Sequence, residues 1–148
     1  MIEFFFDCSS PWTYLAFHNI RPMAAAFGAA ITWRPILVGG IFNTINPSVY
    51  EGRAHPVPAK ARYSGKDMQD WARVAGLKIK MPPSVFPVNS VKAMRMCLVL
   101  GDQLVPFATA VFETLLLSGL FLVVDVAEMA WSLEIESKLL KKIDALVG

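Results

Sequence analysis

The sequence predicts an α/β fold that opens as strand, helix and strand and continues mainly in helices. Residues 2–6 form an apolar run with one polar member, residues 11–27 repeat apolar side chains at helical spacing, and residues 31–37 form a second apolar run. Two strands joined by a crossover helix pair in parallel and are covered on both faces, which fits the apolar character of each run. We therefore expect a strand–helix–strand portion over residues 1–40 and a loop and helical portion over 41–148, within one compact domain.

The first helix has clear signals at both ends. Ser10 is suited to cap it, because Pro11 stands at the first helical position, and Gly28 is suited to end it. After the second strand, residues 41–58 show no periodicity, and we expect a long loop there.

The rest of the chain is predicted to be mainly helical. Helices are expected from Ala59 to a stop at Gly76, from a cap at Asn89 onward, and from Pro106 onward. The prolines between residues 82 and 87 require extended chain. Residues 120–126 are apolar enough for a buried strand or a buried helix, and the residues that follow them favour a helix.

Composition argues against several classes of protein. A net charge of +2 is too small and too scattered for a nucleic-acid-binding protein. The longest apolar stretch, residues 115–124, is far below the roughly 18–20 residues that a membrane span needs, and the N-terminus lacks the basic residues of a signal peptide. Cys8 and Cys97 have neither metal-type spacing nor a disulfide framework, so we expect no metal site and a cytoplasmic location.

Ser10 is the main candidate for chemistry. A helix that starts directly after a strand directs its free N–H groups and positive end to one point, which suits an anion such as a thiolate. A thiol needs about 2–3 kcal/mol to be mostly ionised at neutral pH, of which a helix end supplies ~0.3–1 and a hydroxyl donor ~1.5–3 kcal/mol. Ser10 is therefore either a plain helix cap or the hydrogen-bond donor to a thiolate. A role as hydrolase nucleophile is not supported, because neither His18 nor His55 is placed as its base.

The cysteines and the remaining polar candidates each have two interpretations. A redox Cys-x-x-Cys pair would need a cysteine in place of Pro11, so Cys8 is expected to be a packed residue, and Cys97 to belong to the core. Lys60 starts a helix after Pro58, either as an exposed lysine or as an ammonium group that reaches an acidic ligand near Ser10. Asparagines either cap turns or bind a ligand, and the candidates are Asn43, Asn46 and Asn89.

Four segments carry a family resemblance that covers about residues 2–115. They are FFFDCSSPWTYLA (residues 4–16), WRPILVGGIFN (33–43), VPAKARY with DWAR (57–63 and 70–73), and FPVNS (86–90). In this combination the chain resembles 2-hydroxychromene-2-carboxylate isomerases and kappa-class glutathione transferases.

The resemblance implies a thioredoxin-like fold with a large helical insertion, and glutathione as cofactor. It places Ser10 at the glutathione sulfur and implies a small aromatic or unsaturated substrate. The implied glutathione contacts are Ser10, Pro11, Trp12, Asn46 and Lys60, and the implied substrate contacts are Asn43 and Asn89. Asn43 departs from the lysine that many members carry at that position.

The C-terminal end of the chain departs from the family pattern. Nothing after Pro106 matches the segment that closes the family's domain, which is a cis-proline loop, two antiparallel strands and a helix. We therefore expect a shortened or divergent member with two secure strands, whose apolar surface is covered in a homodimer. The leading hypothesis is a glutathione-dependent isomerase; the alternatives are a kappa-type transferase and a non-catalytic, self-associating domain.

Overall fold

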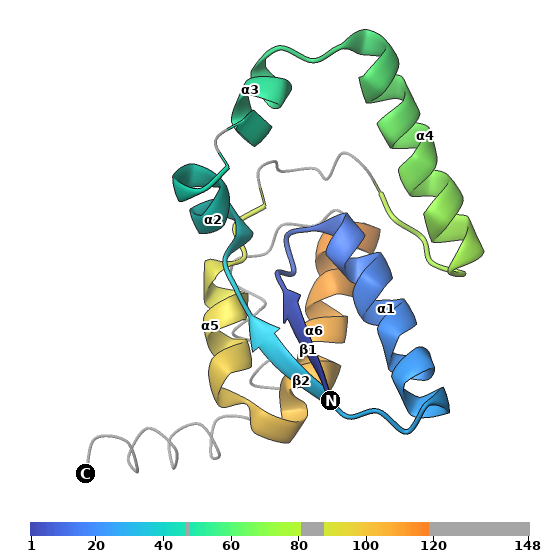
Figure 1. Ribbon diagram of the computed structural model, residues 1–148, viewed down its shortest axis with the longest axis vertical. Coiled ribbons are helices and arrows are strands. Elements are labelled where there is room, and N and C mark those ends of the chain that lie inside the picture. Colours follow the sequence, from blue (N-terminus) through green and yellow to red (C-terminus); the bar gives the residue numbers. More distant parts are fainter. Residues whose placement is uncertain (47, 81–87, 119–148) are drawn as a thin grey trace.

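The computed structural model describes residues 1–46, 48–80 and 88–118, in which two short strands are surrounded by helices (Figure 1). The first three elements are the strand, helix and strand that the sequence predicts. In chain order the elements are β1 (Ile2–Phe6), α1 (Pro11–Ala26), β2 (Ile31–Pro35), α2 (Val38–Thr44), α3 (Ser48–Ala54), α4 (Pro58–Val74), α5 (Val91–Val99), the 3-10 turn η1 (Gly101–Gln103), α6 (Leu104–Glu113) and the π-helical turn η2 (Thr114–Ser118).

The two strands form a parallel sheet, as expected. The register pairs Ile2 with Ile31 at one end and Phe6 with Pro35 at the other. β2 ends at Pro35, two residues before the predicted boundary, because Leu37 is already the residue that precedes the first turn of α2.

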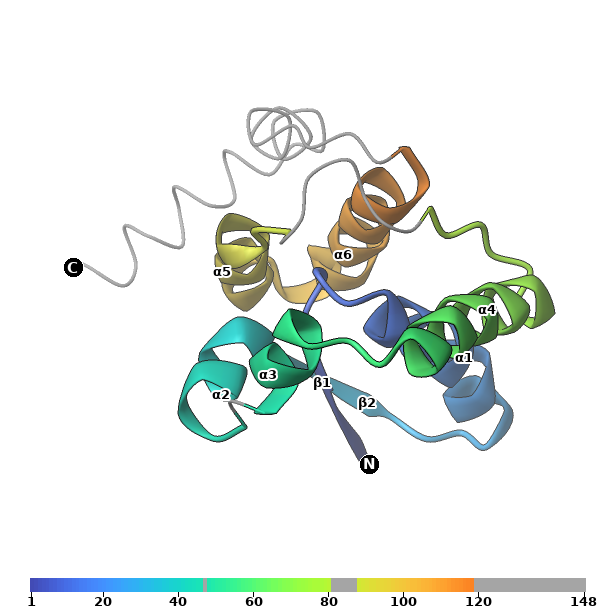
Figure 2. The same cartoon turned by 90° about the horizontal axis from the view of Figure 1, so that it is seen from above.

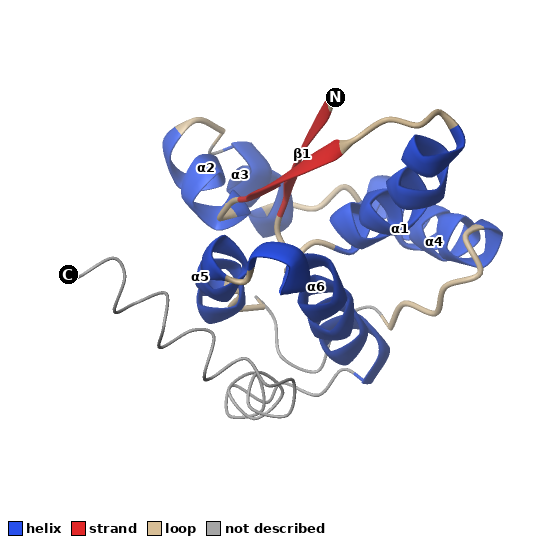
Figure 3. Ribbon diagram, turned by 90° about the horizontal axis from the view of Figure 1, so that it is seen from below, coloured by secondary structure: helices blue, strands red, loops and turns tan. Residues whose placement is uncertain are grey.

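An aromatic cluster joins the sheet to α1 and α6. The ring centroid of Phe17 in α1 lies 5.4 Å from that of Phe6, 4.7 Å from that of Trp33 and 5.3 Å from that of Phe112 in α6. Tyr14, one turn earlier in α1, stacks on Phe112 with centroids 5.0 Å apart. Burying one such ring contributes about 1.5–3 kcal/mol, so this cluster, more than the two-stranded sheet, holds β1, β2, α1 and α6 together. Figure 3 shows α5 and α6 below the strands and α1 to their right.

The predicted signals are confirmed at both ends of α1 and at the end of α4, which begins at Pro58, one residue before the predicted Ala59. Pro11 and Pro58 each begin a helix, where the missing N–H of proline costs nothing. Gly28 and Gly76 follow these helices with φ of 59° and 68°, a left-handed conformation in which a side chain is strained.

The prediction of a long loop over residues 41–58 is wrong. The end of α2 and the whole of α3 fall within it, and only short connections remain between α2, α3 and α4. The rings of Phe42 in α2 and Tyr50 in α3 meet edge to face with centroids 6.5 Å apart.

A tertiary contact explains why α2 is not visible in the sequence. Gly39 and Gly40 are poor helix formers, and Leu37 provides no side-chain cap. The carboxylate of Asp7, which lies at the end of β1, instead accepts a hydrogen bond from the N–H of Val38 at 2.8 Å. A helix that depends on a residue so far away in the chain has no local signature.

Two helices later in the chain begin close to the predicted residues. α6 begins at Leu104, so Pro106 lies inside its first turn and does not open it. α5 begins at Val91 after Ser90, and the predicted cap Asn89 accepts the N–H of Val91 through its Oδ1 at 3.1 Å.

Predictions for residues 82–87 and 120–126 lie outside the described residues. Within the described ranges, no helix is both long enough and apolar enough to cross a bilayer. The same ranges contain no group of three or more His, Cys, Asp or Glu side chains that could hold a metal ion.

Candidate functional site

The carboxyl ends of β1 and β2 point into one region, where α1 and α2 begin (Figure 1). Seen from above, the end of β1 lies between α2 and α3 on one side and α1 and α4 on the other (Figure 2). Ligands of α/β proteins bind beyond the carboxyl ends of parallel strands. Residues 7–10, which connect β1 to α1 and are called the Ser10 junction below, lie in this region.

Ser10 caps α1, as one of its two interpretations predicts. Its backbone is extended, with φ of −101° and ψ of 118°, and its Oγ accepts the N–H of Thr13 at 3.2 Å. Its carbonyl accepts the N–H of Tyr14 at 3.0 Å, and its own N–H donates to the carbonyl of Asp7 at 3.2 Å. The backbone of Ser10 is therefore fixed on both sides.

The capping role leaves the Ser10 hydroxyl able to donate. A hydroxyl has one hydrogen and two lone pairs, so Oγ can accept from Thr13 and donate its hydrogen at the same time. Among the described residues no acceptor takes this hydrogen, and Ser10 is partly exposed. An anion next to Ser10 can therefore receive a hydrogen bond.

The first turn of α1 offers fewer free amides than expected. Pro11 has no N–H, and the N–H groups of Thr13 and Tyr14 are bound to Ser10. In the part of the chain that the structure describes, the N–H of Trp12 is the amide of this turn that has no partner. An anion at the junction thus meets two donors, the Ser10 hydroxyl and the Trp12 amide. The side chain of Trp12 is 42% exposed beside them.

Asp7 organises the junction, and sequence reasoning missed it. Asp7 is only 2% exposed, and its two carboxylate oxygens accept hydrogen bonds from different segments of the chain. Oδ1 accepts the N–H of Ser9 at 2.9 Å, and Oδ2 accepts the N–H of Val38 in α2 at 2.8 Å. Aspartate side chains often accept a hydrogen bond from the backbone N–H two residues later, which forms an Asx turn. This tendency could have revealed the bond from Ser9, but no local signal could have revealed the bond from Val38.

Cys8 is a packed residue, as predicted, and not a nucleophile. Cys8 and Cys97 are 0% and 1% exposed, and the backbone N–H of Cys8 contacts the Sδ of Met94 at 3.3 Å. Burial raises the pKa of the Cys8 thiol well above its ordinary value, and the neighbouring Cys97 and the charge of Asp7 raise it further. A buried thiol that stays protonated is unreactive at neutral pH.

The other predicted contacts are not joined to the Ser10 junction by any hydrogen bond or ion pair within the described ranges. Asn43 is exposed on α2, and Asn46 accepts the hydroxyl of Ser48 at the start of α3. Lys60 is exposed in the first turn of α4, and this turn lies at the top of Figure 1, apart from the start of α1. Asn89 is occupied at the start of α5.

Neither histidine of the described structure contacts Ser10. His18 is exposed on α1, and His55 is exposed between α3 and α4. The junction therefore lacks the base that a serine nucleophile requires, in agreement with the sequence.

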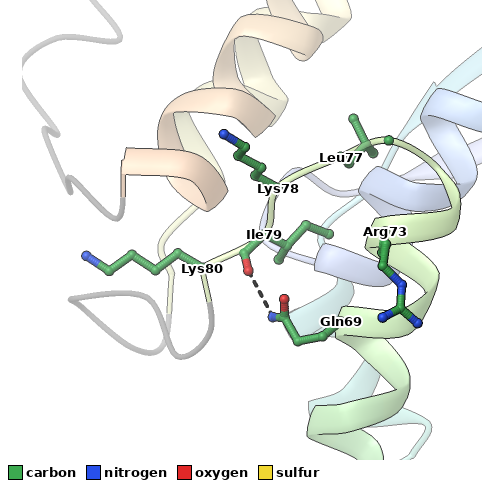
Figure 4. Close-up of a pocket in the computed structure, with 7 residues that line it drawn as sticks. Gln69, Arg73, Leu77, Lys78, Ile79 and Lys80 are labelled. Atoms are coloured by element: carbon green, nitrogen blue, oxygen red, sulfur yellow. Dashed lines mark hydrogen bonds between the residues drawn. The ribbon is translucent and has the colours of Figure 1, made fainter.

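Two cavities of the described structure lie away from Ser10. One, of about 440 Å³, follows the turn after α4 from Gly76 to Lys80 and includes Gln69 and Arg73 (Figure 4). Gln69 donates to the carbonyl of Ile79 at 2.9 Å, while the side chains of Lys78, Lys80 and Arg73 extend in different directions. These cations do not converge on a ligand. The other cavity, of about 380 Å³, lies between β2 and the end of α5 and is mainly apolar.

The sequence matches the family described as DSBA-like thioredoxin domain over residues 1–129. The chain belongs to this family. It is also similar to glutathione S-transferase kappa 2 of Caenorhabditis elegans, with 29% identity over 83 residues, which are 55% of this chain and 35% of that protein. A third similarity is to 2-hydroxychromene-2-carboxylate isomerase of Pseudomonas putida, with 28% identity over 92 residues, 60% of this chain and 40% of that protein.

A solved structure of a 2-hydroxychromene-2-carboxylate isomerase shares the fold. The TM-score is 0.64 at 21% identity, with 94% of this chain and 66% of that chain covered. The predicted thioredoxin-like fold and the resemblance to these two groups of proteins are thereby confirmed. The aligned regions span well under half the length of the two relatives.

Proposed function

We propose that this chain is a glutathione-dependent isomerase of the 2-hydroxychromene-2-carboxylate type, with Ser10 as the donor to the glutathione thiolate. One observation carries the proposal: a partly exposed hydroxyl with an unused hydrogen stands next to an unpaired amide at the carboxyl end of β1. The reaction class is inferred from the isomerase of Pseudomonas putida, whose similarity covers more than half of the residues of this chain.

Energies favour a larger contribution from Ser10 than from the helix. Making a thiol mostly ionised at neutral pH requires about 2–3 kcal/mol, because its pKa starts near ~8.5. One free amide at the start of α1 falls within the ~0.3–1 kcal/mol that a helix end contributes. A hydroxyl donor to a charged acceptor contributes ~1.5–3 kcal/mol in a sheltered site, so the serine is needed and the helix alone is insufficient.

Glutathione, when bound, would supply a thiolate that adds to a conjugated double bond of the substrate, permits rotation and leaves unchanged. Ser10 and the Trp12 amide fit its sulfur end, because both are donors and a thiolate only accepts. We assign Lys60 and Asn46 to the peptide part of glutathione, and Asn43 and Asn89 to the substrate, on the family resemblance. The exposed ring of Trp12, together with the neighbouring Pro11, provides an apolar surface that the tripeptide can contact.

The test separates the cap from the thiolate donor. Ser10→Asp keeps an acceptor for the Thr13 N–H and favours the helix N-terminus, but it has no donor and repels an anion. We expect Ser10→Asp to unfold at the same denaturant concentration as the unchanged protein, or a higher one, and to lose glutathione binding by more than about tenfold in calorimetry. Ser10→Thr, which keeps the hydroxyl, is the matched control and retains binding. Undiminished binding by Ser10→Asp would refute the role of Ser10.

A kappa-type glutathione transferase is the second candidate, favoured by the similarity to the Caenorhabditis elegans protein. The same thiolate would then be conjugated to an electrophile and consumed. Parallel assays with a chromene carboxylate and a chlorinated nitroarene distinguish the two reactions, because the isomerase regenerates glutathione and the transferase does not. A folded protein that binds no glutathione and sediments as an oligomer would instead support the non-catalytic, self-associating domain.

A further inference from the structure

The carboxylate of Asp7 connects two segments that are far apart in the sequence. Oδ1 accepts from Ser9 within the Ser10 junction, and Oδ2 accepts from Val38 at the start of α2. The residue is 2% exposed, and each oxygen has one N–H donor at 2.8–2.9 Å. Hydrogen bonds to a charged, buried acceptor are among the stronger polar contacts in a protein.

The bond to Val38 has a particular structural importance. α2 has no buried residue and no side-chain cap, so few other contacts fix the start of this helix. Next to it, the N–H of Ile36 donates to the carbonyl of Phe6 at 2.9 Å, which brings the end of β2 beside the end of β1. Asp7 thus holds together the segments that follow the two strands, which are the Ser10 junction after β1 and the start of α2 after β2.

We propose that Asp7 is a positioning residue that holds the Ser10 junction and the start of α2 as one binding unit, with α2 as the second wall of the thiolate site. This inference rests on the proposed function, because the thiolate is the ligand that the unit would hold. Asp7 acts through backbone amides and touches no reacting atom.

Two variants break the bond between Asp7 and Val38 from opposite ends. Asp7→Ala removes both carboxylate oxygens, and with them the acceptor for the Val38 N–H. Val38→Pro removes the donor, and proline is tolerated there because Val38 is the first residue of a helix and Leu37 before it is extended. Val38→Ala changes the same side chain and keeps the N–H, so it is the matched control.

A double-mutant cycle on glutathione affinity provides the decisive result. We expect Asp7→Ala and Val38→Pro each to weaken binding about tenfold, and the double variant to be no weaker than Asp7→Ala, because the alanine already removes the bond that the proline removes. Ile79→Val, which destabilises the core away from the junction, should bind glutathione as the unchanged protein does. Additive losses, or single variants with normal affinity, would overturn the proposal.

Hydrogen exchange keeps the inference testable without glutathione. The Val38 amide should exchange at least about tenfold faster in Asp7→Ala than in the unchanged protein, because its acceptor is lost. Asp102→Ala, at an exposed position, should leave this rate unchanged. If the unchanged protein binds no glutathione, the proposed function fails. Equal Val38 exchange in Asp7→Ala would separately show that Asp7 does not hold α2.

Discussion

The core unit (β1, α1, β2, α5 and α6) and the outer helices (α2, α3 and α4) are stabilised in different ways. Most buried side chains of the described residues belong to the core unit, including the largest ones, Phe6, Phe17, Phe107 and Phe112. By contrast α2 has no buried residue, and α4 buries only Met68 and Ala72 in its 17 residues. The Ser10 junction lies where the two regions meet.

This difference suggests a division of roles at the site. Ser10 stands on the side fixed by aromatic packing, where Tyr14 and Phe17 anchor α1 against Phe112. The opposite side, α2, is held by polar contacts such as the bond from Val38 to Asp7. Regions with few buried contacts open more easily, so we expect α2 to open more readily than α1, and its position to depend on the bond to Asp7.

The largest expected effect lies in the core unit. Phe17→Ala removes a ring that contacts four other aromatic side chains, and we expect it to lower the free energy of unfolding by about 3–5 kcal/mol. Trp71→Ala on α4 removes a larger ring that is 53% exposed and should cost less than about 1 kcal/mol. Urea denaturation measures both. Equal losses in the two variants would abolish the distinction between the regions.

A pH effect on stability should arise beside the site. Burial raises the pKa of Cys8, so its thiol remains neutral in the folded protein, whereas the thiol of the unfolded chain ionises from pH ~8.5 upward. Below that pH both states are neutral and Cys8 has no effect. Above it the unfolded state loses a proton that the folded state keeps, so the free energy of unfolding falls, by about 1 kcal/mol at pH ~9.5.

Urea denaturation at pH values of about 7.5 and 9.5 checks this expectation. Cys8→Ala should lose less stability between the two pH values than the unchanged protein, because the ionising group is gone. An identical loss in both proteins would mean that the Cys8 thiol does not contribute.

The smallest effects are expected from glycine-to-alanine substitutions, one in each region. Gly65→Ala lies within α4, where an added Cβ meets no atom within 4 Å, and should stabilise the protein by about 0.5–1 kcal/mol. Gly28→Ala, at φ of 59° after α1, should destabilise it by about 1 kcal/mol or more, because a left-handed conformation strains a side chain. Thermal unfolding of the two variants should therefore shift in opposite directions, and shifts of the same sign would contradict this account.

Local signals account for the parts of the fold that the sequence predicts well. Ser10 with Pro11, and Gly28 after α1, act within a few residues, so the start and end of the first helix follow from the sequence alone. The mainly apolar runs before and after this helix likewise predict the two strands, and the crossover between them predicts their parallel pairing.

The parts that sequence reasoning missed depend on contacts between distant residues. Asp7 and Val38 are 31 positions apart, and their bond replaces the local cap that α2 lacks. The contact between Cys8 and Met94 joins residues 86 positions apart. Within the candidate site, the sequence identifies Ser10 and the start of α1, but the one free amide of Trp12 emerges only when every hydrogen bond of the first turn is placed.

The acidity of bound glutathione tests the central claim most directly. The ultraviolet absorbance of the thiolate, followed against pH in the presence of the protein, yields the pKa of the bound thiol. We expect this pKa to lie about 1.5–2 units below that of free glutathione, and to return most of the way in Ser10→Ala, because the hydroxyl supplies the larger share of the stabilisation. A bound thiol as weakly acidic as the free one, or one equally acidified in Ser10→Ala, would contradict the claim.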